Sequence, residues 1–162
     1  IQKADRGTVF PITKGRGLMP FSSIEINVEV TGPLFDGGGG QKLAHKWTKK
    51  MVQQLTEKGE QRLDDMLRPR PGGVYKSVED AGRNASIGHY RSNVVGKQRD
   101  LVAIITDSGV VYGPWLEGTS SRNQTTRFKG YFSFRKTRQY LRRNKEKLIR
   151  PIIRKMMRNL GG

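Results

Sequence analysis

The spacing of apolar residues between Gln41 and Leu67 restricts the fold of this chain more than any other feature. Leucine, tryptophan and methionine recur there three, four or eight residues apart, with lysine, glutamine and glutamate between them. Such spacing places the apolar side chains on one face of a long α-helix. RPRPGG follows, and Pro69 disfavours helix at Arg68. The sequence therefore predicts one long amphipathic helix over 41–67, whose apolar face needs a second layer.

Alternating residues predict that layer. The segment 24–30 alternates Ile and Val with Glu and Asn, which is typical of a strand with one buried face. Runs at 86–95, 100–106 and 110–112 predict a three-strand meander with DSG as a turn. We therefore expect an antiparallel sheet of about four strands, packed against the long helix.

A second helical pattern covers about Arg135 to Leu160. One stripe is apolar and most other residues are Arg, Lys or Asn, so the helix is amphipathic and strongly basic. Pro151 lies inside it, where a proline either kinks a helix or begins a second segment. The order strand, long helix, strands, long helix predicts the α+β class.

A chain of 162 residues suits one domain. Residues 1–21 show no apolar period and are expected to form an extended N-terminal arm, while 22–162 form a single α+β domain with a flexible glycine-rich loop at 32–40. The chain has no cysteine, which excludes disulfides and thiolate metal sites. No apolar run approaches the roughly 18 to 20 residues of a membrane span.

Positive charge is concentrated near the C-terminus. The formal net charge is +17, and from Arg122 onward 14 Lys and Arg face a single acid, Glu146. This implies a polyanion, an acidic protein surface or a face turned toward nucleic acid, against the simpler alternative of a solvated face that maintains solubility. The candidates for a DNA-facing or acidic-surface-facing role are Arg135, Lys136, Arg138, Arg142, Arg143, Lys145, Lys147, Arg150, Arg154, Lys155 and Arg158.

Catalytic motifs are missing from the sequence. No HExxH, CxxC, GxSxG or GxxxxGK[ST] pattern occurs, and His45 and His89 are the only histidines. The pairs 64–65 and 79–80 are acidic, but adjacent helical residues point to different faces and the second pair lies in a loop. We therefore expect no catalytic, cofactor-binding or metal-binding residues, and a protein that is not an enzyme.

Aromatic residues lie beside arginines in RFKGYFSF, at 127–134. Such residues can stack on bases in single-strand binders, although in a β-like segment they more often belong to a core or an interface. No zinc finger, basic zipper or RNP-like motif is present, so nucleic acid would be contacted through its phosphates. A sequence-independent nucleic-acid-binding protein, ribosomal or nucleoid-like, is thus one alternative.

The run VVYGPWLEGTS, at 110–120, resembles the Tyr-x-x-Trp/Tyr-hydrophobic-Glu-x-Gly-Thr signature of siphophage tail-completion and head–tail joining proteins, also described as neck or minor tail proteins. The arrangement of elements also resembles that family over roughly 24–160. The shared order is a long helix, a Pro/Gly break, a Ser-hydrophobic element, the signature, an Arg/Phe segment and a C-terminal helix with an early Pro. Two departures occur. The segment 73–77 replaces the usual Thr-Gly-x-Leu, and Glu117 meets Gly118 without an intervening apolar residue.

The resemblance implies a structural subunit of a tailed-phage neck, located in the virion and assembled in the host cytoplasm. Its copies would form a ring, a hexamer, that joins the capsid connector to the tail tube and lets DNA pass. The implied partners are other copies, the neck, connector and tail-tube proteins, and genomic DNA through non-specific contact. The arm and the glycine-rich loop are expected to order on assembly.

The signature residues are physically suited to a structural corner or an interface. Tyr112 and Trp115 are expected to anchor a strand end, Pro114 to fix a turn and Gly118 to allow a tight bend. Glu117 is expected to accept backbone or arginine hydrogen bonds, either as a buried structural carboxylate or at an interface. The complete set is Tyr112, Pro114, Trp115, Glu117, Gly118 and Thr119.

Overall fold

The computed structural model describes residues 22–30, 32, 38–68 and 85–160. The α+β class is confirmed. The expected arm at 1–21, the loop residues 33–37 and the helix break at 69–73 lie outside the described residues. In chain order the elements are β1 (Ser23–Asn27), α1 (Gly38–Leu67), α3 (Ala85–Ser92), β2 (Val95–Arg99), β3 (Val102–Thr106), α4 (Gly113–Leu116), α5 (Arg122–Thr125) and α6 (Ser133–Leu160).

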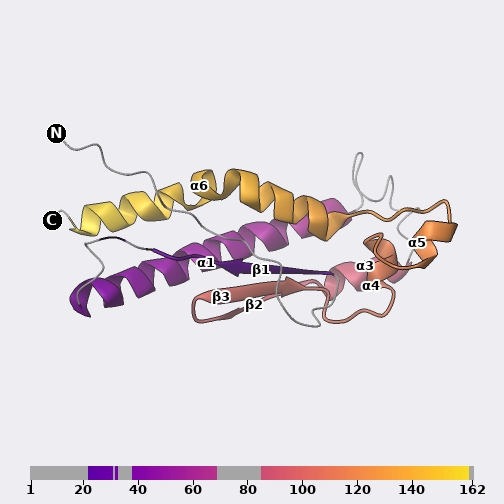
Figure 1. Ribbon diagram of the computed structural model, residues 1–162, viewed down its shortest axis with the longest axis horizontal. Coiled ribbons are helices and arrows are strands. Elements are labelled where there is room, and N and C mark those ends of the chain that lie inside the picture. The colour runs from indigo at the N-terminus through magenta and orange to yellow at the C-terminus, as the bar shows by residue number, and fades with distance from the viewer. Residues whose placement is uncertain (1–21, 31, 33–37, 69–84, 161–162) are drawn as a thin grey trace.

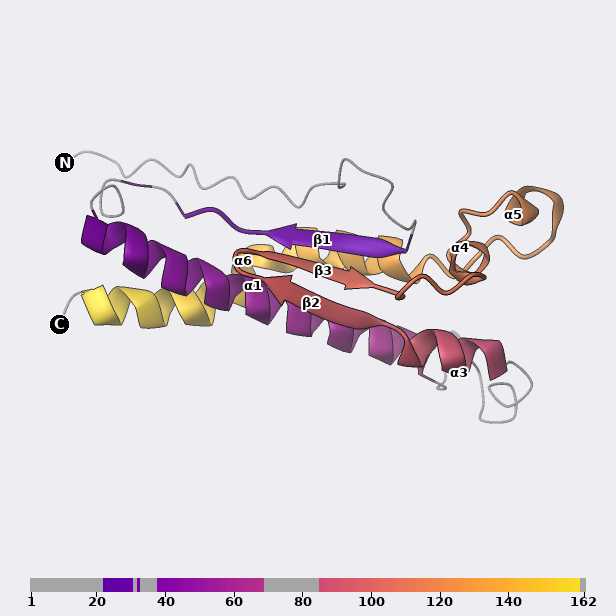
Figure 2. The same ribbon diagram turned by 90° about the horizontal axis from the view of Figure 1, so that it is seen from below.

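The described elements form two layers. The sheet is antiparallel with the order β1-β3-β2, so β3 is its central strand. The helices α1 and α6 run side by side in opposite directions and lie on the same face of the sheet (Figures 1 and 2). The opposite face of the sheet carries no helix among the described residues (Figure 2).

Side-chain alternation explains why the sheet has two unlike faces. Ile24 pairs with Ile105 and Ile26 pairs with Ala103 across β1 and β3, and all four side chains are fully buried. Successive strand residues point to opposite faces, so these residues meet the helices while their neighbours face outward. Val102, on the outward face, is 40% exposed.

The interior lies where α1, β3 and α6 meet. Gly59 is buried in the middle of α1, and a β-carbon there would collide with Cδ1 of Ile105 and lie 3.2 Å from Cδ1 of Leu141. The missing side chain lets α1 lie close to both β3 and α6. The largest buried apolar side chains of the two helices are Trp47, Met51, Leu55, Leu63 and Leu67 in α1 and Phe134, Leu141, Ile149 and Met156 in α6.

The expected strand over 86–95 is wrong for most of its length. Residues 85–92 form α3, and β2 begins only at Val95. Tyr90 is fully buried, and Asn93 ends the helix by donating its backbone N–H and its side-chain amide to the His89 carbonyl. An eight-residue helix that buries Tyr90 therefore replaces most of the predicted strand.

The expected strand over 110–112 is also wrong. Ser108 and Gly109 have positive φ values of 57° and 79°, and the Gly113 N–H donates to the Val110 carbonyl at 2.8 Å. These turns lead directly into α4, and Val111 is 95% exposed. Within the described residues the sheet has three strands rather than the four expected.

The two long helices differ from the expected boundaries at their starts. α1 begins at Gly38, so part of the expected glycine-rich loop forms its first turn. α6 begins at Ser133, within the Arg/Phe segment, and contains Pro151. The helix is bent rather than straight (Figure 1), in keeping with the hydrogen bond that an interior proline removes.

Each edge strand of the sheet receives one charged side chain from a helix. On β2, the Gly96 N–H donates to the Glu60 carboxylate of α1 at 2.5 Å. On β1, the Arg138 guanidinium of α6 donates to the Ser23 carbonyl at 2.6 Å. The helices thus hold the sheet through its edges as well as through its apolar face.

Candidate functional site

The signature residues surround a buried carboxylate. Glu117 follows α4 directly and is 4% exposed. Its Oε2 accepts the backbone N–H of Phe134 at 2.9 Å, and its Oε1 accepts the hydroxyl of Tyr90 at 3.3 Å. This single side chain therefore connects α4 to α3 and to the first turn of α6.

The backbone around Glu117 is closely packed. Gly118 has a φ of 76°, and a β-carbon there would collide with the Lys129 carbonyl and the Phe132 ring. The Tyr131 N–H donates to the Leu116 carbonyl at 2.7 Å. Because Gly118 follows Glu117 without an intervening residue, the chain turns directly after the carboxylate. It then packs against residues 129–132, which lead into α6.

Burial shifts the acidity of the groups in this cluster. The pKa of Glu117 is raised because burial disfavours its charged form, although the N–H of Phe134 opposes the shift. The pKa of Tyr90 is raised by burial and by the neighbouring Glu117 charge. Burial also raises the pKa of Asp107, whose Oδ1 accepts the Gly109 N–H at 3.0 Å.

The remaining signature residues pack around α4. Tyr112 and Trp115 are half-buried against the core, and Pro114 occupies the start of α4. The Thr119 N–H donates to the Pro114 carbonyl at 2.8 Å. Tyr112 and Trp115 therefore belong to a turn and a short helix, and not to the strand end that the sequence suggested.

Asn123 holds the polar loop after the signature in place. It is buried in α5, and its side-chain amide donates to the carbonyls of Trp115 and Phe128 at 2.9 and 3.2 Å. The Trp115 and Phe128 rings lie 4.7 Å apart. The aromatic segment before α6 is thus occupied in packing within the chain.

The candidate cations of α6 divide into two groups. Arg138 and Lys145 are half-buried, and burial lowers the pKa of Arg138. Lys155 is exposed and lines a groove of about 360 Å³ between α6 and Trp47 of α1. The others are exposed: Arg135, Lys136, Arg142, Arg143, Lys147, Arg150, Arg154 and Arg158.

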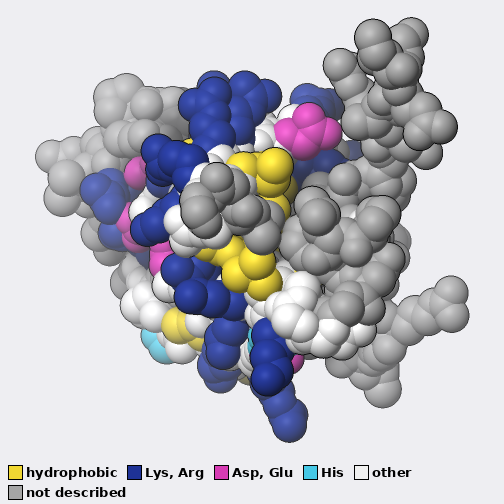
Figure 3. Space-filling view, turned by 90° about the vertical axis from the view of Figure 1, so that its left-hand side faces the viewer, with side chains coloured by type: hydrophobic (Ala, Val, Ile, Leu, Met, Phe, Trp, Pro, Cys, Tyr) yellow, Lys and Arg dark blue, Asp and Glu magenta, His cyan; other side chains and the backbone are white. Residues whose placement is uncertain are grey.

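The end of the molecule where α1 begins and α6 ends carries a mixed surface. Lys and Arg side chains surround a small apolar area there (Figure 3). Met157, which is 55% exposed, lies near this end of α6.

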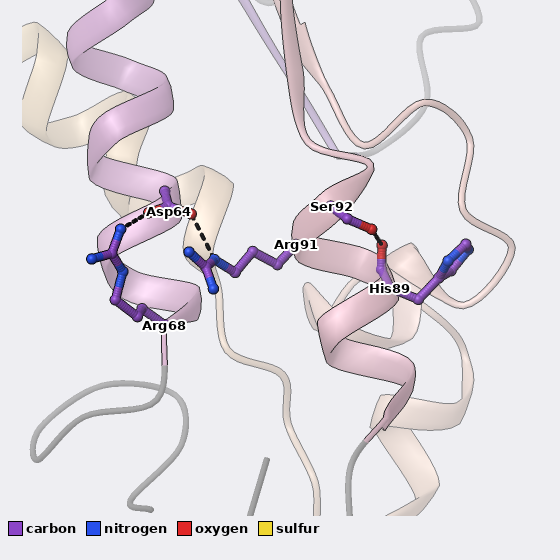
Figure 4. A network of polar contacts seen from close by, with 5 residues as sticks. All are labelled: Asp64, Arg68, His89, Arg91 and Ser92. Carbon is purple, nitrogen blue, oxygen red and sulfur yellow. Dashed lines mark hydrogen bonds and ion pairs between the residues drawn. The ribbon is translucent and has the colours of Figure 1, made fainter. Parts of the chain in front are cut away.

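The acidic pair at 64–65 does not form a joint site. The Asp64 carboxylate accepts Arg91 Nε at 2.6 Å and Arg68 at 2.5 Å, which joins α1 to α3 (Figure 4). The hydrogen bond from Arg91, more than any other contact, lowers the pKa of Asp64. His89 lies on α3 away from the Asp64 carboxylate, and the Ser92 hydroxyl donates to its backbone carbonyl at 2.9 Å (Figure 4).

The remaining predicted chemistry has a limited structural counterpart. The acidic pair at 79–80 lies outside the described residues. His45 contacts the Asp100 carboxylate at 2.8 Å on the surface. No group of three or more His, Asp or Glu side chains in the described ranges is placed to hold a metal ion. Nor does any helix in those ranges combine the length and apolarity needed to cross a bilayer.

Tyr90 and Asp107 are the members of the buried cluster that sequence reasoning missed. Tyr90 lay in the expected strand and Asp107 in the DSG turn, so neither was connected with Glu117. The comparisons supply no further identification: no protein-family model, no curated protein and no solved structure matches this chain.

Proposed function

We propose that this protein is a structural subunit of the neck of a tailed bacteriophage. Its copies form a ring that joins the capsid connector to the tail tube and lets DNA pass, and the subunit is not an enzyme. The observation that carries this proposal is the run at 110–120, which resembles the signature of tail-completion and head–tail joining proteins.

The geometry of that run supports a structural role. Glu117, the one carboxylate of the signature, is buried and accepts hydrogen bonds from Phe134 and Tyr90. In this chain that position accounts for the acid of the run and for the glycine that follows it directly. The carboxylate accepts a backbone N–H at the start of α6, and the positive φ of Gly118 turns the chain directly after the carboxylate.

The open face of the sheet supports assembly. A hollow of about 560 Å³ lies over β2 and β3 and includes Lys97, Arg99, Val102 and Ile104 in its lining. Exposed apolar surface bordered by polar side chains is typical of protein contact sites. A neighbouring subunit would bury Val102 and Ile104 and leave the cations at the rim.

The assembly is tested by the mass and symmetry of purified protein, alone and mixed with a connector ring. Native mass spectrometry and negative-stain electron microscopy should show a closed oligomer or a stoichiometric complex with the connector. A chain that remains monomeric in both samples contradicts the proposal.

The alternative is a free nucleic-acid-binding protein, and the exposed cations of α6 favour it. Such a protein would bind DNA or RNA as a monomer or dimer with a steep salt dependence. Measuring mass and binding on the same sample separates the two functions, because only the neck subunit should assemble into a ring.

A further inference from the structure

We propose that one face of α6 binds the phosphate backbone of duplex DNA without reading its sequence. Six exposed cations define this face, which we name the cationic ridge. Apart from the first gap of seven residues, they recur every three or four residues. They are Lys136, Arg143, Lys147, Arg150, Arg154 and Arg158.

The spacing aligns the ridge along one side of the helix. At about 100° per residue, all six positions fall within a sector of roughly 80°. From Lys136 to Arg158 the helix rises by about 33 Å, close to one turn of B-form DNA at about 34 Å. The ridge is therefore about as long as one turn of the duplex, the distance after which a strand's phosphates again face the same side of the DNA.

The ridge cations are not neutralised within the described chain. The ion pairs His45–Asp100, Arg68–Asp64 and Arg91–Asp64 lie elsewhere in the described chain, and none of them involves a ridge cation. The only acid in α6 is Glu146, beside the ridge. Uncompensated charge of this density attracts a polyanion.

The helix presents these charges in a fixed arrangement. Leu141, Ile149 and Met156 lie on the other side of α6 and are buried against the core. The N–H of Phe134 is held by Glu117 at the start of the helix. Binding therefore requires ordering of side chains only, and not folding of the helix.

The composition of the ridge favours DNA over an acidic protein. Protein interfaces have an apolar centre depleted of charge, whereas DNA-binding surfaces are more polar and strongly positive. Among the described side chains, Met157 is the only large apolar one that α6 exposes, and it lies near the C-terminal end. Four of the six cations are arginines, whose planar guanidinium groups bind phosphate with two hydrogen bonds.

In the neck, the ridge would face the genome in the lumen of the ring. That placement rests on the proposed function, whereas binding by the purified protein does not. A sequence-independent attraction between side chains and phosphates holds DNA while allowing it to slide.

Fluorescence anisotropy with two unrelated 20-base-pair duplexes tests the ridge. Both should bind equally, and the slope of log K against log salt should be roughly −5 for six phosphate contacts. Affinity should then fall about a thousandfold between 50 and 200 mM salt. Binding that distinguishes the two sequences, or that does not depend on salt, overturns the proposal.

The triple variant K147Q/R150Q/R154Q identifies the surface. Glutamine maintains helix propensity, and losing three contacts should reduce the salt slope by roughly 3. The matched control K42Q/K46Q/K49Q removes three exposed cations from α1, so the net charge falls equally. Circular dichroism establishes that both variants remain folded.

Each outcome has a defined meaning. If the ridge variant loses DNA affinity and the control variant retains it, the result supports binding at the ridge. Equal loss of DNA affinity in both variants overturns the proposal. Binding to polyglutamate but not to DNA overturns it in favour of an acidic protein. A ring that does not bind DNA contradicts only the ridge, while a DNA-binding monomer contradicts only the neck assembly.

Discussion

The carboxylate of Glu117 accepts the backbone N–H of Phe134 at 2.9 Å and so occupies the N-terminus of α6. Helix N-termini carry a partial positive charge and unpaired N–H groups, which an anion stabilises. The hydroxyl of Tyr90 donates to the same carboxylate at 3.3 Å. Three helices thus depend on one buried acid.

Replacing that acid should destabilise the fold. Glu117→Ala leaves the Phe134 N–H and the Tyr90 hydroxyl without their partner, which should reduce the free energy of unfolding by about 1 to 3 kcal/mol. Urea denaturation measures the change. Glu146→Ala is the matched control, since Glu146 is exposed on α6, the helix whose start Glu117 contacts, and should change stability by less than about 0.5 kcal/mol. Equal losses in the two variants would contradict this role for Glu117.

Burial of Glu117 should also appear in the pH dependence of stability. Its folded pKa is raised above the ordinary 4.5, so the folded protein binds the proton more tightly than the unfolded chain. This contribution is fully present below pH 4.5 and is lost as the pH rises through the folded pKa. The stability of wild type relative to Glu117→Gln should therefore fall between pH 4.5 and neutrality.

The pH experiment uses urea denaturation of both proteins at each pH. Burial raises the pKa of Asp107 as well, so Asp107 adds a pH-dependent contribution of the same sign to the stability of both proteins. This contribution cancels when the stability of Glu117→Gln is subtracted from that of wild type. A difference that is constant, or that grows with pH, would show that Glu117 is not desolvated.

Gly59 should not tolerate a side chain. Gly59→Ala improves helix propensity but forces a methyl group against Ile105, and overpacking of a core costs about 1 to 3 kcal/mol. We expect net destabilisation in thermal denaturation. Ile105→Val removes the colliding Cδ1, so Gly59→Ala should cost less in that background than in wild type.

A second glycine of α1 serves as the control for Gly59. A β-carbon at Gly39 would meet no atom within 4 Å, so Gly39→Ala should stabilise by about 0.5 to 1 kcal/mol. If Gly59→Ala and Gly39→Ala both gain stability, the result contradicts the close contact between α1 and β3 at Gly59.

The Asp64 network should contribute little. Asp64 and Arg91 are 38% and 34% exposed, and ion pairs of that exposure contribute at most about 1 kcal/mol. Asp64→Asn should therefore lower stability slightly in dilute salt and hardly at all in about 1 M salt, where exposed charges are screened. Because Arg91 lowers the pKa of Asp64, this contribution is present above pH 3.8 and is lost as the pH falls. A loss as large as that of Glu117→Ala would contradict this estimate.

β1 and α1 could be predicted because each needs only one buried face. The alternation of Ile24 and Ile26 and the spacing of Trp47, Met51 and Leu55 determine which side faces the core. The segment 86–95 could not be predicted, since its apolar residues are few enough to fit either period. Tyr90 is fixed by Glu117, 27 residues away, which no local pattern reveals.

The candidate site was predictable in part. The signature directs attention to Glu117, but its sequence leaves a buried role and an interface role open. Its partner Tyr90 and the nearby Asp107 come from segments whose structure depends on distant contacts. Charge in the sequence identifies the cations of α6, but it does not separate Arg138 from the exposed ones. Only the position of β1 shows that the Arg138 guanidinium donates to the Ser23 carbonyl.

The charged side chains at the margins of the sheet have a consequence for solubility. A foreign strand arriving at β2 would have to displace Glu60 from the Gly96 N–H, and at β1 it would have to displace Arg138 from the Ser23 carbonyl. Breaking a charge-assisted hydrogen bond before forming a new one discourages uncontrolled fibril-like stacking. The same two contacts that fasten the sheet to its helices thus protect the isolated chain from aggregation.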